Sequence, residues 1–148
     1  METNSAGLSL IKGFEGLRLN PYTCEAGIWT IGYGATYNLD GSKITRRTPA
    51  ITIKAAEILL QVLLKSRERQ VAKLITAPLG NNQFGALVSF VYNLGSGALQ
   101  SSSLRMKINR QDYVGASKEF ERWVYCSGKK LPGLLRRRYA ERDLFLAV

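Results

Sequence analysis

Histidine is absent from this chain, and cysteine occurs only twice among its 148 residues. Without an imidazole, a Ser/His/Asp triad and a Cys/His protease are excluded, and no Cys/His/Asp cluster has the spacing of a zinc site. Two cysteines make no disulfide framework, so we expect Cys24 and Cys126 to be free thiols of a protein made in a reducing cytosol. The two glycines of GYGAT, at 32–36, lack the third glycine and the βαβ unit of a dinucleotide site, and we expect no cofactor.

Acidic residues are also scarce, because 11 Asp and Glu stand against 21 Lys and Arg, which gives a net charge of +10. This excess favours a polyanionic partner such as a bacterial envelope, nucleic acid or an anionic membrane, although a generally basic soluble surface explains it equally well. The first 16 residues have neither the basic start nor the long apolar run of a secretory signal or membrane anchor. We therefore expect a cytoplasmic protein that needs a second agent for release.

The rest of the chain looks like scaffold for residues 13–36, GFEGLRLNPYTCEAGIWTIGYGAT. Apolar residues at helical spacing predict a short helix over 5–14. Alternating apolar and polar residues over 17–24 and 28–33, around a Glu-Ala-Gly centre, are typical of a β-hairpin. The sequence therefore predicts a helix that leads directly into a hairpin.

Three chemically loaded side chains converge in this prediction. With a turn centred near Ala26 or Gly27, Cys24 and Thr30 face each other across the strands, with Cβ atoms roughly 5 Å apart. Glu15 lies at the C-terminal end of the preceding helix, where the chain enters the first strand. A carboxyl, a thiol and a hydroxyl could thus share one groove, which is a candidate active site.

Cleavage of a glycosidic bond needs one protonated carboxyl for the leaving oxygen and one group that activates water or stabilises positive charge at the sugar carbon. Glu15 suits the first role, and otherwise it is a helix-end glutamate paired with Arg18. Cys24 as a thiolate could serve as base or as a stabilising charge, and otherwise it packs as a small strand residue. Thr30 could orient the water or simply favour the strand, whereas strand alternation points Glu25 to the other face.

The remaining chain predicts helices in a single domain, which at this length can bury roughly 70% of its unfolded surface. Thr52 offers an N-cap to a long helix over 53–75, about 35 Å in length. The apolar stripe of this helix comprises Ile53, Ala56, Leu60, Leu63, Leu64, Val71 and Leu74. Asn81 or Asn82 should cap the next helix, which is apolar nearly all round and ends at Gly95, as expected of a buried central helix.

Three shorter helices follow in this prediction. One begins at Ser102 or Ser103 and runs to Ile108, one extends from an Asp112 cap to Trp123, and the last runs over 132–145 with Pro132 in its first turn. Between the last two helices, residues 128–130 are the candidate mobile loop. The region 37–49 lacks a helical period and predicts irregular strand and loop.

The pattern Glu, eight residues, Cys, five residues, Thr, followed by GYGAT, resembles the catalytic segment of the phage lysozymes, the endolysin muramidases. In most of that family the middle residue is Asp, and Cys24 matches a variant pattern. Residues 82–109 and 120–144 resemble later segments of the family in the same order. The resemblance implies an α+β, lysozyme-like fold in one catalytic domain over 1–148. Its expected parts are a β-containing lobe at about 15–50, a linking helix at about 52–75, and a helical lobe at about 81–148 with the N-terminal helix.

The resemblance further implies a bacteriolytic glycoside hydrolase, a monomer that cleaves the β-1,4 bond between N-acetylmuramic acid and N-acetylglucosamine in peptidoglycan and lyses the host cell. Glu15, Cys24 and Thr30 would be the catalytic residues. The residues implied to line the glycan groove are Thr36, Tyr92, Ser103 and Arg137. Ala35 stands where the family commonly has His, as in GYGHT, which removes a stabilising pair but not the cleavage chemistry.

Two other classes of function remain open on the sequence. In one, the substituted centre is inactive and the charge makes the protein a cationic binder of envelope or nucleic acid, although no nucleic-acid partner is expected of a muramidase. In the other, the cationic C-terminal helix over 132–145 damages membranes directly, an activity that would survive loss of Glu15.

Overall fold

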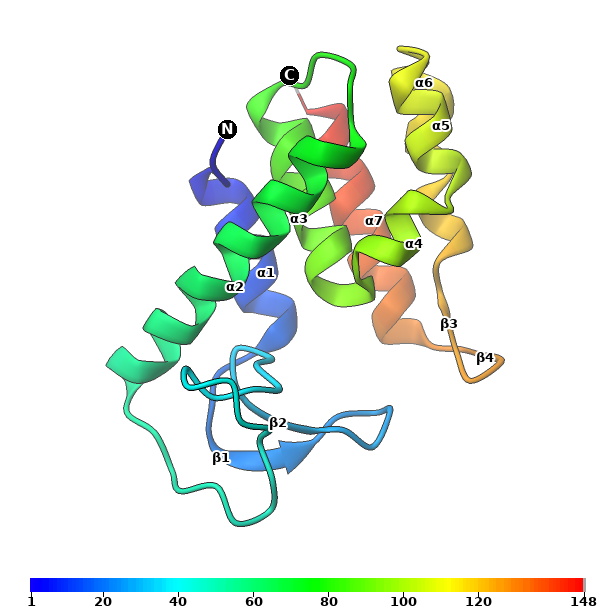
Figure 1. The fold of residues 1–148 in the computed structure, drawn as a ribbon. Helices are drawn as coiled ribbons and strands as arrows, with labels where there is room; N and C mark the ends of the chain where they lie inside the picture. Colours follow the sequence, from blue (N-terminus) through cyan, green and yellow to red (C-terminus); the bar gives the residue numbers. More distant parts are fainter. Residues whose placement is uncertain (148) are drawn as a thin grey trace. The chain divides into compact units, whose positions relative to one another are not determined.

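The computed structural model describes residues 1–147 and has a mixed α+β architecture (Figure 1). In chain order its elements are α1 (Ser5–Glu15), β1 (Arg18–Thr23), β2 (Trp29–Gly32), α2 (Ile53–Leu74), α3 (Asn81–Leu94), α4 (Ser96–Gln100), α5 (Ser103–Asn109), α6 (Tyr113–Ser117), the 3-10 helix η1 (Phe120–Arg122), β3 (Tyr125–Cys126), β4 (Lys129–Lys130) and α7 (Pro132–Leu146). The backbone forms two compact units. We call Lys12–Leu64 the hairpin unit, and Met1–Ile11 together with the chain from Lys65 onward the helical unit.

The hairpin unit is built on the antiparallel pair of β1 and β2, as the alternation predicts. The pairing register shifts between Arg18 and Tyr22, a segment that contains Pro21, which has no N–H to donate to the ladder. Gly27, at φ +77°, closes the turn by donating its N–H to the Cys24 carbonyl at 2.8 Å. A small core packs behind the hairpin, made of Ile31, Ala35, Ile44 and Leu59 with Trp29, Ile51 and Leu63 against it.

The long helix α2 ends within one residue of its predicted bound, and its predicted cap is confirmed because Ala55 N–H donates to Thr52 Oγ1 at 3.0 Å. The predicted apolar stripe is wrong at its first member, since Ile53 is 58% exposed. Residues 52–54 are all exposed, so the first turn of α2 extends beyond the core that the later turns cover. Ala56, Leu60, Leu64 and Val71 are buried as predicted.

The helical unit has α3 as its buried central helix, with eight consecutive buried residues from Phe84 to Val91. The helix α7 packs along α3 (Figure 1). Gly7 of α1 and Gly85 of α3 approach so closely that a Cβ atom on Gly7 would lie 2.9 Å from the Gly85 Cα. Gly95, at φ +89°, ends α3 with its N–H on the Val91 carbonyl, as predicted.

The start of α3 differs from the predicted asparagine cap. Gly80 is the N-cap, and its N–H donates to Gln83 Oε1 at 2.8 Å. The side chain of Asn82 is engaged elsewhere, because its Oδ1 accepts a hydrogen bond from Asn4 at 2.8 Å. A contact between segments far apart in the sequence has therefore taken the cap residue that the local pattern favoured.

The predicted helix from the Asp112 cap to Trp123 is too long. Asp112 does cap α6 by accepting from Gly115 N–H at 2.9 Å, but α6 ends at Ser117. The Ser117 hydroxyl donates to the Val114 carbonyl at 2.6 Å, and the following N–H groups turn to i−3 carbonyls, which tightens the chain into η1. The predicted starts of α5 and α7 are confirmed, while α4 was not predicted.

The segment predicted as a loop at 128–130 is the tip and second strand of the short β3–β4 hairpin. Ser127 and Gly128 form its turn at φ +51° and +79°, in the left-handed region. The irregular region at 37–49 agrees with its prediction, since only isolated bridges occur there, such as Tyr37 with Lys43.

Candidate active site

Glu15 is the last residue of α1, as the pattern predicts, and its side chain is half-buried. Gly16 follows at φ +69° and donates its N–H to the Lys12 carbonyl at 2.9 Å, which closes the helix. A glycine adopts this left-handed conformation without a Cβ clash, so the chain can turn directly from α1 into β1. The carboxyl therefore stands at the junction between helix and hairpin.

Thr30 and Cys24 lie in a register that differs from the expected direct pairing. Thr30 is paired with Tyr22, and Cys24 N–H donates to the Ile28 carbonyl at 3.0 Å, so the turn is centred on Ala26. Direct opposition of Cys24 and Thr30 is therefore wrong. The two residues remain on one face of the hairpin as diagonal neighbours, a relation that spans about 7–8 Å between Cα atoms.

One backbone carbonyl links the thiol and hydroxyl residues. Ile28 C=O accepts both the Cys24 N–H and, at 2.9 Å, the Thr30 hydroxyl. Thr30 is only 3% exposed, so its hydroxyl proton is held in this bond away from bulk water. Its oxygen can then act toward a further partner only as an acceptor.

Tyr22 belongs to the same candidate site, although the sequence pattern does not single it out. Its ring faces the Arg18 guanidinium, 4.8 Å from the ring centroid. The pKa of Tyr22 is raised, chiefly by burial and then by the negative charges of Glu15 and Cys24, against the opposing effect of Arg18. The period of two along β1, which puts residues 22 and 24 on one face, was the sequence signal that could have found it.

The carboxylate beside Cys24 and the alanine at the family's histidine position also have clear places. Glu25 is exposed in the hairpin turn. Ala35 is buried in the small core and exchanges both backbone hydrogen bonds with Ile31. Thr36, a predicted groove residue of the hairpin unit, is half-buried, and its carbonyl accepts from Ile44 N–H at 3.0 Å.

The other predicted groove residues belong to the helical unit. Tyr92 lies near the end of α3 and Ser103 is the first residue of α5, and both are half-buried. Arg137 on α7 is only 4% exposed, and its Nε and Nη2 donate to the hydroxyl and carbonyl of Ser89, both at 3.3 Å. The three residues thus lie on three different helices, α3, α5 and α7.

A buried ionic cluster surrounds Arg137. Glu141 is fully buried, with one carboxylate oxygen 2.7 Å from Arg138 Nε and the other accepting from Arg138 Nη2 at 3.0 Å and from the Ser89 hydroxyl at 2.6 Å. Arg137 Nε lies 3.4 Å from the same carboxylate. Arg137 is the only one of the three arginines at 136–138 that the resemblance implicates in the groove, yet Arg137 and Arg138 are both buried.

Within residues 1–147, no group of three or more Cys, Asp or Glu side chains is arranged to hold a metal ion. The same residues include no helix that is long and apolar enough to span a membrane. Both cysteines are free, as predicted, and both are half-buried.

Comparison with known proteins agrees with this architecture. The chain is 42% identical over 150 residues to the endolysin of Acyrthosiphon pisum secondary endosymbiont phage 1, covering 98% of each protein. Its fold matches the endolysin from Escherichia coli O157:H7 phage FAHEc1 with a TM-score of 0.88 and 37% identity, over 99% of this chain and 94% of that one. It also matches the muramidase domain of SpmX from Asticaccaulis excentricus with a TM-score of 0.85 and 34% identity, over 99% of both chains.

The expected lysozyme-like α+β fold is thereby confirmed, and so is the expected class of enzyme, a glycoside hydrolase of the endolysin muramidase type. The family model described as phage lysozyme matches residues 12–141, which include the helix end, the hairpin and most of the helical unit. This chain belongs to the phage lysozyme family, whose members act on peptidoglycan.

Proposed function

We propose that Glu15, Cys24 and Thr30 together hydrolyse the β-1,4 bond between N-acetylmuramic acid and N-acetylglucosamine. The observation that carries this proposal is the shared Ile28 carbonyl, which accepts hydrogen bonds from both the Thr30 hydroxyl and the Cys24 backbone N–H. Glu15 and Cys24 both act electrostatically on Tyr22, which is paired with Thr30, and this supports a common site for Glu15, Cys24 and Thr30.

Glu15 is the general acid in this scheme. Its protonated carboxyl donates to the glycosidic oxygen as the bond to the sugar carbon breaks, because the leaving sugar would otherwise depart as an alkoxide. Glu25 is exposed in the turn and takes no part. The proton returns to Glu15 from solvent after the product leaves.

Cys24 and Thr30 orient the attacking water. Since the Thr30 hydroxyl donates its proton to the Ile28 carbonyl, the hydroxyl oxygen of Thr30 accepts one hydrogen of the water. The Cys24 thiolate accepts the other hydrogen and removes it as the water oxygen bonds to the sugar carbon, and the resulting thiol releases that proton to solvent before the next turnover. Both water hydrogens then point toward the protein and a lone pair points toward the substrate. Cys24 thus replaces the aspartate that is usual in the family.

Four further residues are proposed to contact the glycan, namely Thr36, Tyr92, Ser103 and Arg137. The first three are half-buried, an exposure that permits hydrogen bonds to sugar hydroxyls. Arg137 is the least exposed of the four, so its removal should act more through Ser89 and Glu141 than through lost sugar affinity.

The helical unit supports an attraction to anionic envelope polymers. It carries fifteen Lys and Arg against seven Asp and Glu, a net +8, whereas the hairpin unit has six against four, a net +2. All five carboxylates from Asp112 to Asp143 accept hydrogen bonds or form ion pairs inside the unit. The exposed cations between Arg110 and Arg136 form what we call the basic surface: Arg110, Lys118, Arg122, Lys129, Lys130 and Arg136.

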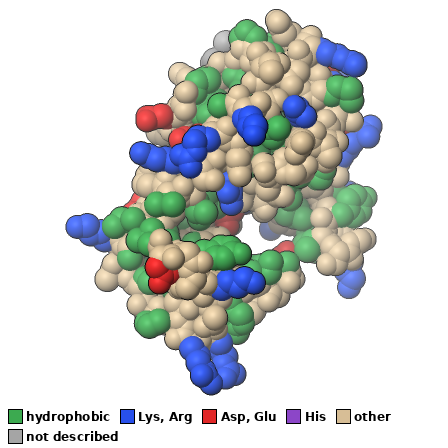
Figure 2. Space-filling model, in the orientation of Figure 1, with side chains coloured by type: hydrophobic (Ala, Val, Ile, Leu, Met, Phe, Trp, Pro, Cys, Tyr) green, Lys and Arg blue, Asp and Glu red, His purple; other side chains and the backbone are tan. Residues whose placement is uncertain are grey.

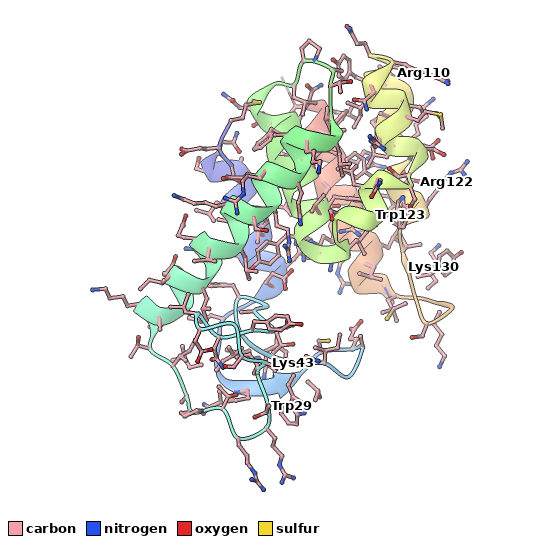
Figure 3. The ribbon with its side chains drawn as sticks, in the orientation of Figure 1. Trp29, Lys43, Arg110, Arg122, Trp123 and Lys130 are labelled. Carbon is pink, nitrogen blue, oxygen red and sulfur yellow. The ribbon has the colours of Figure 1, made fainter. Side chains whose placement is uncertain are left out.

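The basic surface is open to solvent. Arg110, Arg122 and Lys130 extend away from the packed elements in Figure 3, and Lys and Arg outnumber Asp and Glu on the face shown in Figure 2. Clustered charge of one sign raises the local concentration of a polyanion and its rate of encounter. We propose that this surface brings the enzyme to the cell wall, and that the enzyme is a monomer.

In the phage cycle, the enzyme would be made in the host cytoplasm. It would reach peptidoglycan with the help of a separate membrane-permeabilising factor and then lyse the cell. The free, half-buried thiols fit synthesis in a reducing compartment.

Release of new reducing ends from purified peptidoglycan tests the proposal. Glu15→Gln should lower the rate by about 10² to 10⁴, because an amide cannot donate the proton that the leaving oxygen needs. Glu25→Gln is the matched control and should keep the wild-type rate. A Glu15→Gln enzyme with more than a tenth of the activity would refute the assignment, and a wild-type protein that binds without releasing ends would indicate a cationic binder.

A further inference from the structure

A small polar cluster joins three elements of the hairpin unit. Lys12 Nζ lies 2.7 Å from Glu57 Oε1, and the Tyr33 hydroxyl donates to the same oxygen at 3.4 Å. Lys12 Nζ also lies 5.4 Å from the centroid of the Tyr33 ring. Lys12 belongs to the last turn of α1, Tyr33 follows β2 directly, and Glu57 lies in the second turn of α2.

These contacts connect the elements that carry the proposed chemistry. Lys12 is three residues before Glu15, and its carbonyl accepts the Gly16 N–H that closes α1. Lys12 is therefore held by its backbone at the helix end and by its side chain to Glu57. Tyr33 is three residues after Thr30 and directly follows β2, the strand that carries Thr30. The hydrogen bond to Glu57 raises the pKa of Lys12, so the cation persists over the whole neutral range.

The pair is too exposed to contribute much stability. The side chains of Lys12 and Glu57 are 33% and 37% exposed, and ion pairs of this kind are typically worth about 0–1 kcal/mol. The reaction rate is more sensitive to the position of the catalytic group, because a displacement of about 1 Å at a reacting group can lower a rate by about 10². Loss of the pair should therefore lower kcat measurably while changing the free energy of unfolding only slightly.

We propose that Lys12, Glu57 and Tyr33 are positioning residues that fix the end of α1, and with it the Glu15 carboxyl, relative to the strand that carries Thr30. The proposal rests on the general-acid role proposed for Glu15. The cluster does not touch the reacting bond. It restricts the motion of the acid so that the proton is delivered from one geometry.

Kinetics of Lys12→Met, Glu57→Gln and the double variant on soluble glycan chains test the cluster. Each single variant should lower kcat about three- to tenfold with KM within twofold of wild type, and the double variant should be no worse than the poorer single variant. Lys12→Arg, which keeps the cation, should recover most of kcat. Tyr33→Phe retains the ring and should have a smaller effect on kcat.

Lys107→Met is the matched control. Lys107 Nζ lies 2.7 Å from Glu119 Oε1 with the lysine 37% exposed, so this pair has the same chemistry in the helical unit. Its loss should leave kcat unchanged. The proposal fails if Lys12→Met and Glu57→Gln keep wild-type kcat, if they change only KM, or if their losses multiply in the double variant. An active Glu15→Gln enzyme would instead refute the proposed function itself, whatever the cluster does.

Discussion

The hairpin unit and the helical unit differ in how deeply their ion pairs are buried. In the hairpin unit, the Lys12–Glu57 pair is partly exposed, and the buried Thr30 hydroxyl is held by a backbone carbonyl. In the helical unit, Glu141 and Arg138 are completely buried against each other, and the surplus cations lie on the surface. The hairpin unit thus leaves its ion pair near solvent, whereas the helical unit buries one in its interior.

This contrast suggests a division of labour. Buried ions are costly to leave unpaired, so a cluster such as that of Glu141 makes the helical unit depend on every member. Groups that exchange protons with substrate must instead keep access to solvent, as the half-buried Glu15 and Cys24 do. We expect stability and envelope attraction to depend on the helical unit, and chemistry on the hairpin unit.

The largest expected effect is on stability, from Glu141→Gln. The amide leaves two buried guanidinium groups without their anion, and breaking a buried pair in this way typically costs about 3–5 kcal/mol. Denaturant unfolding followed by circular dichroism measures the loss. The fraction that stays folded should keep its activity per molecule.

Glu121→Gln is the control for this prediction. Glu121 Oε1 lies 2.7 Å from Arg142, which belongs to α7 as Glu141 does, but the Glu121 side chain is 44% exposed. Its loss should cost less than about 1 kcal/mol. Equal costs for the two variants would remove the contrast between buried and surface ions.

The second effect is on activity, from substitutions at Cys24. Cys24→Ala should lower kcat by up to about 10², because the water loses its base, with little change in stability. Cys24→Asp restores a group that can act as a base and should keep substantial activity. Initial rates on soluble glycan chains decide this.

Alkylation gives an independent check on the thiol. In an enzyme whose Cys126 is replaced by Ser, alkylation of Cys24 should inactivate, and substrate should protect against it. If Cys24→Ala works as well as wild type, the thiol is only a packing residue, and Glu15 with a Thr30-bound water must suffice.

The smallest effect is on binding. In a Glu15→Gln background that leaves the substrate uncut, the double change Lys129→Glu and Lys130→Glu should weaken sedimentation with purified peptidoglycan about three- to tenfold at low salt. The same charge change at Arg46 and Arg47 in the hairpin unit should cost less. Both differences should shrink as salt rises, because charges are screened over about 8–10 Å at physiological ionic strength. Equal losses would mean that total charge, and not the basic surface, attracts the wall.

Much of the fold was predictable because local patterns decide helix existence and ends. The Thr52 hydroxyl, the Ser102 hydroxyl and Pro132 set the starts of α2, α5 and α7, and Gly95 ends α3. Each acts through groups within about one helical turn, so neighbours in the sequence suffice. The uninterrupted apolar character of α3 likewise predicted its burial.

Part of the candidate site was also legible in the sequence. The alternation on both sides of Glu25 to Gly27 predicted the hairpin, and the apolar spacing before it placed Glu15 at a helix end. The register could not be read from alternation, since turns centred on Ala26 and on Gly27 keep the same residues on one face. The choice decided that Thr30 is paired with Tyr22 and that its hydroxyl bonds to Ile28.

The sequence by itself determined most of the elements, the free thiols, the charge excess and the order of Glu15, Cys24 and Thr30 along the chain. Only the tertiary structure decided which polar groups are paired, because those partners are distant in sequence. Asn82 bonds to Asn4 instead of capping α3, and Lys12 finds Glu57. Arg138 is buried because Glu141 and Asn93 together compensate the loss of its hydration. Such compensation depends on three-dimensional packing, and no local pattern of residues encodes it.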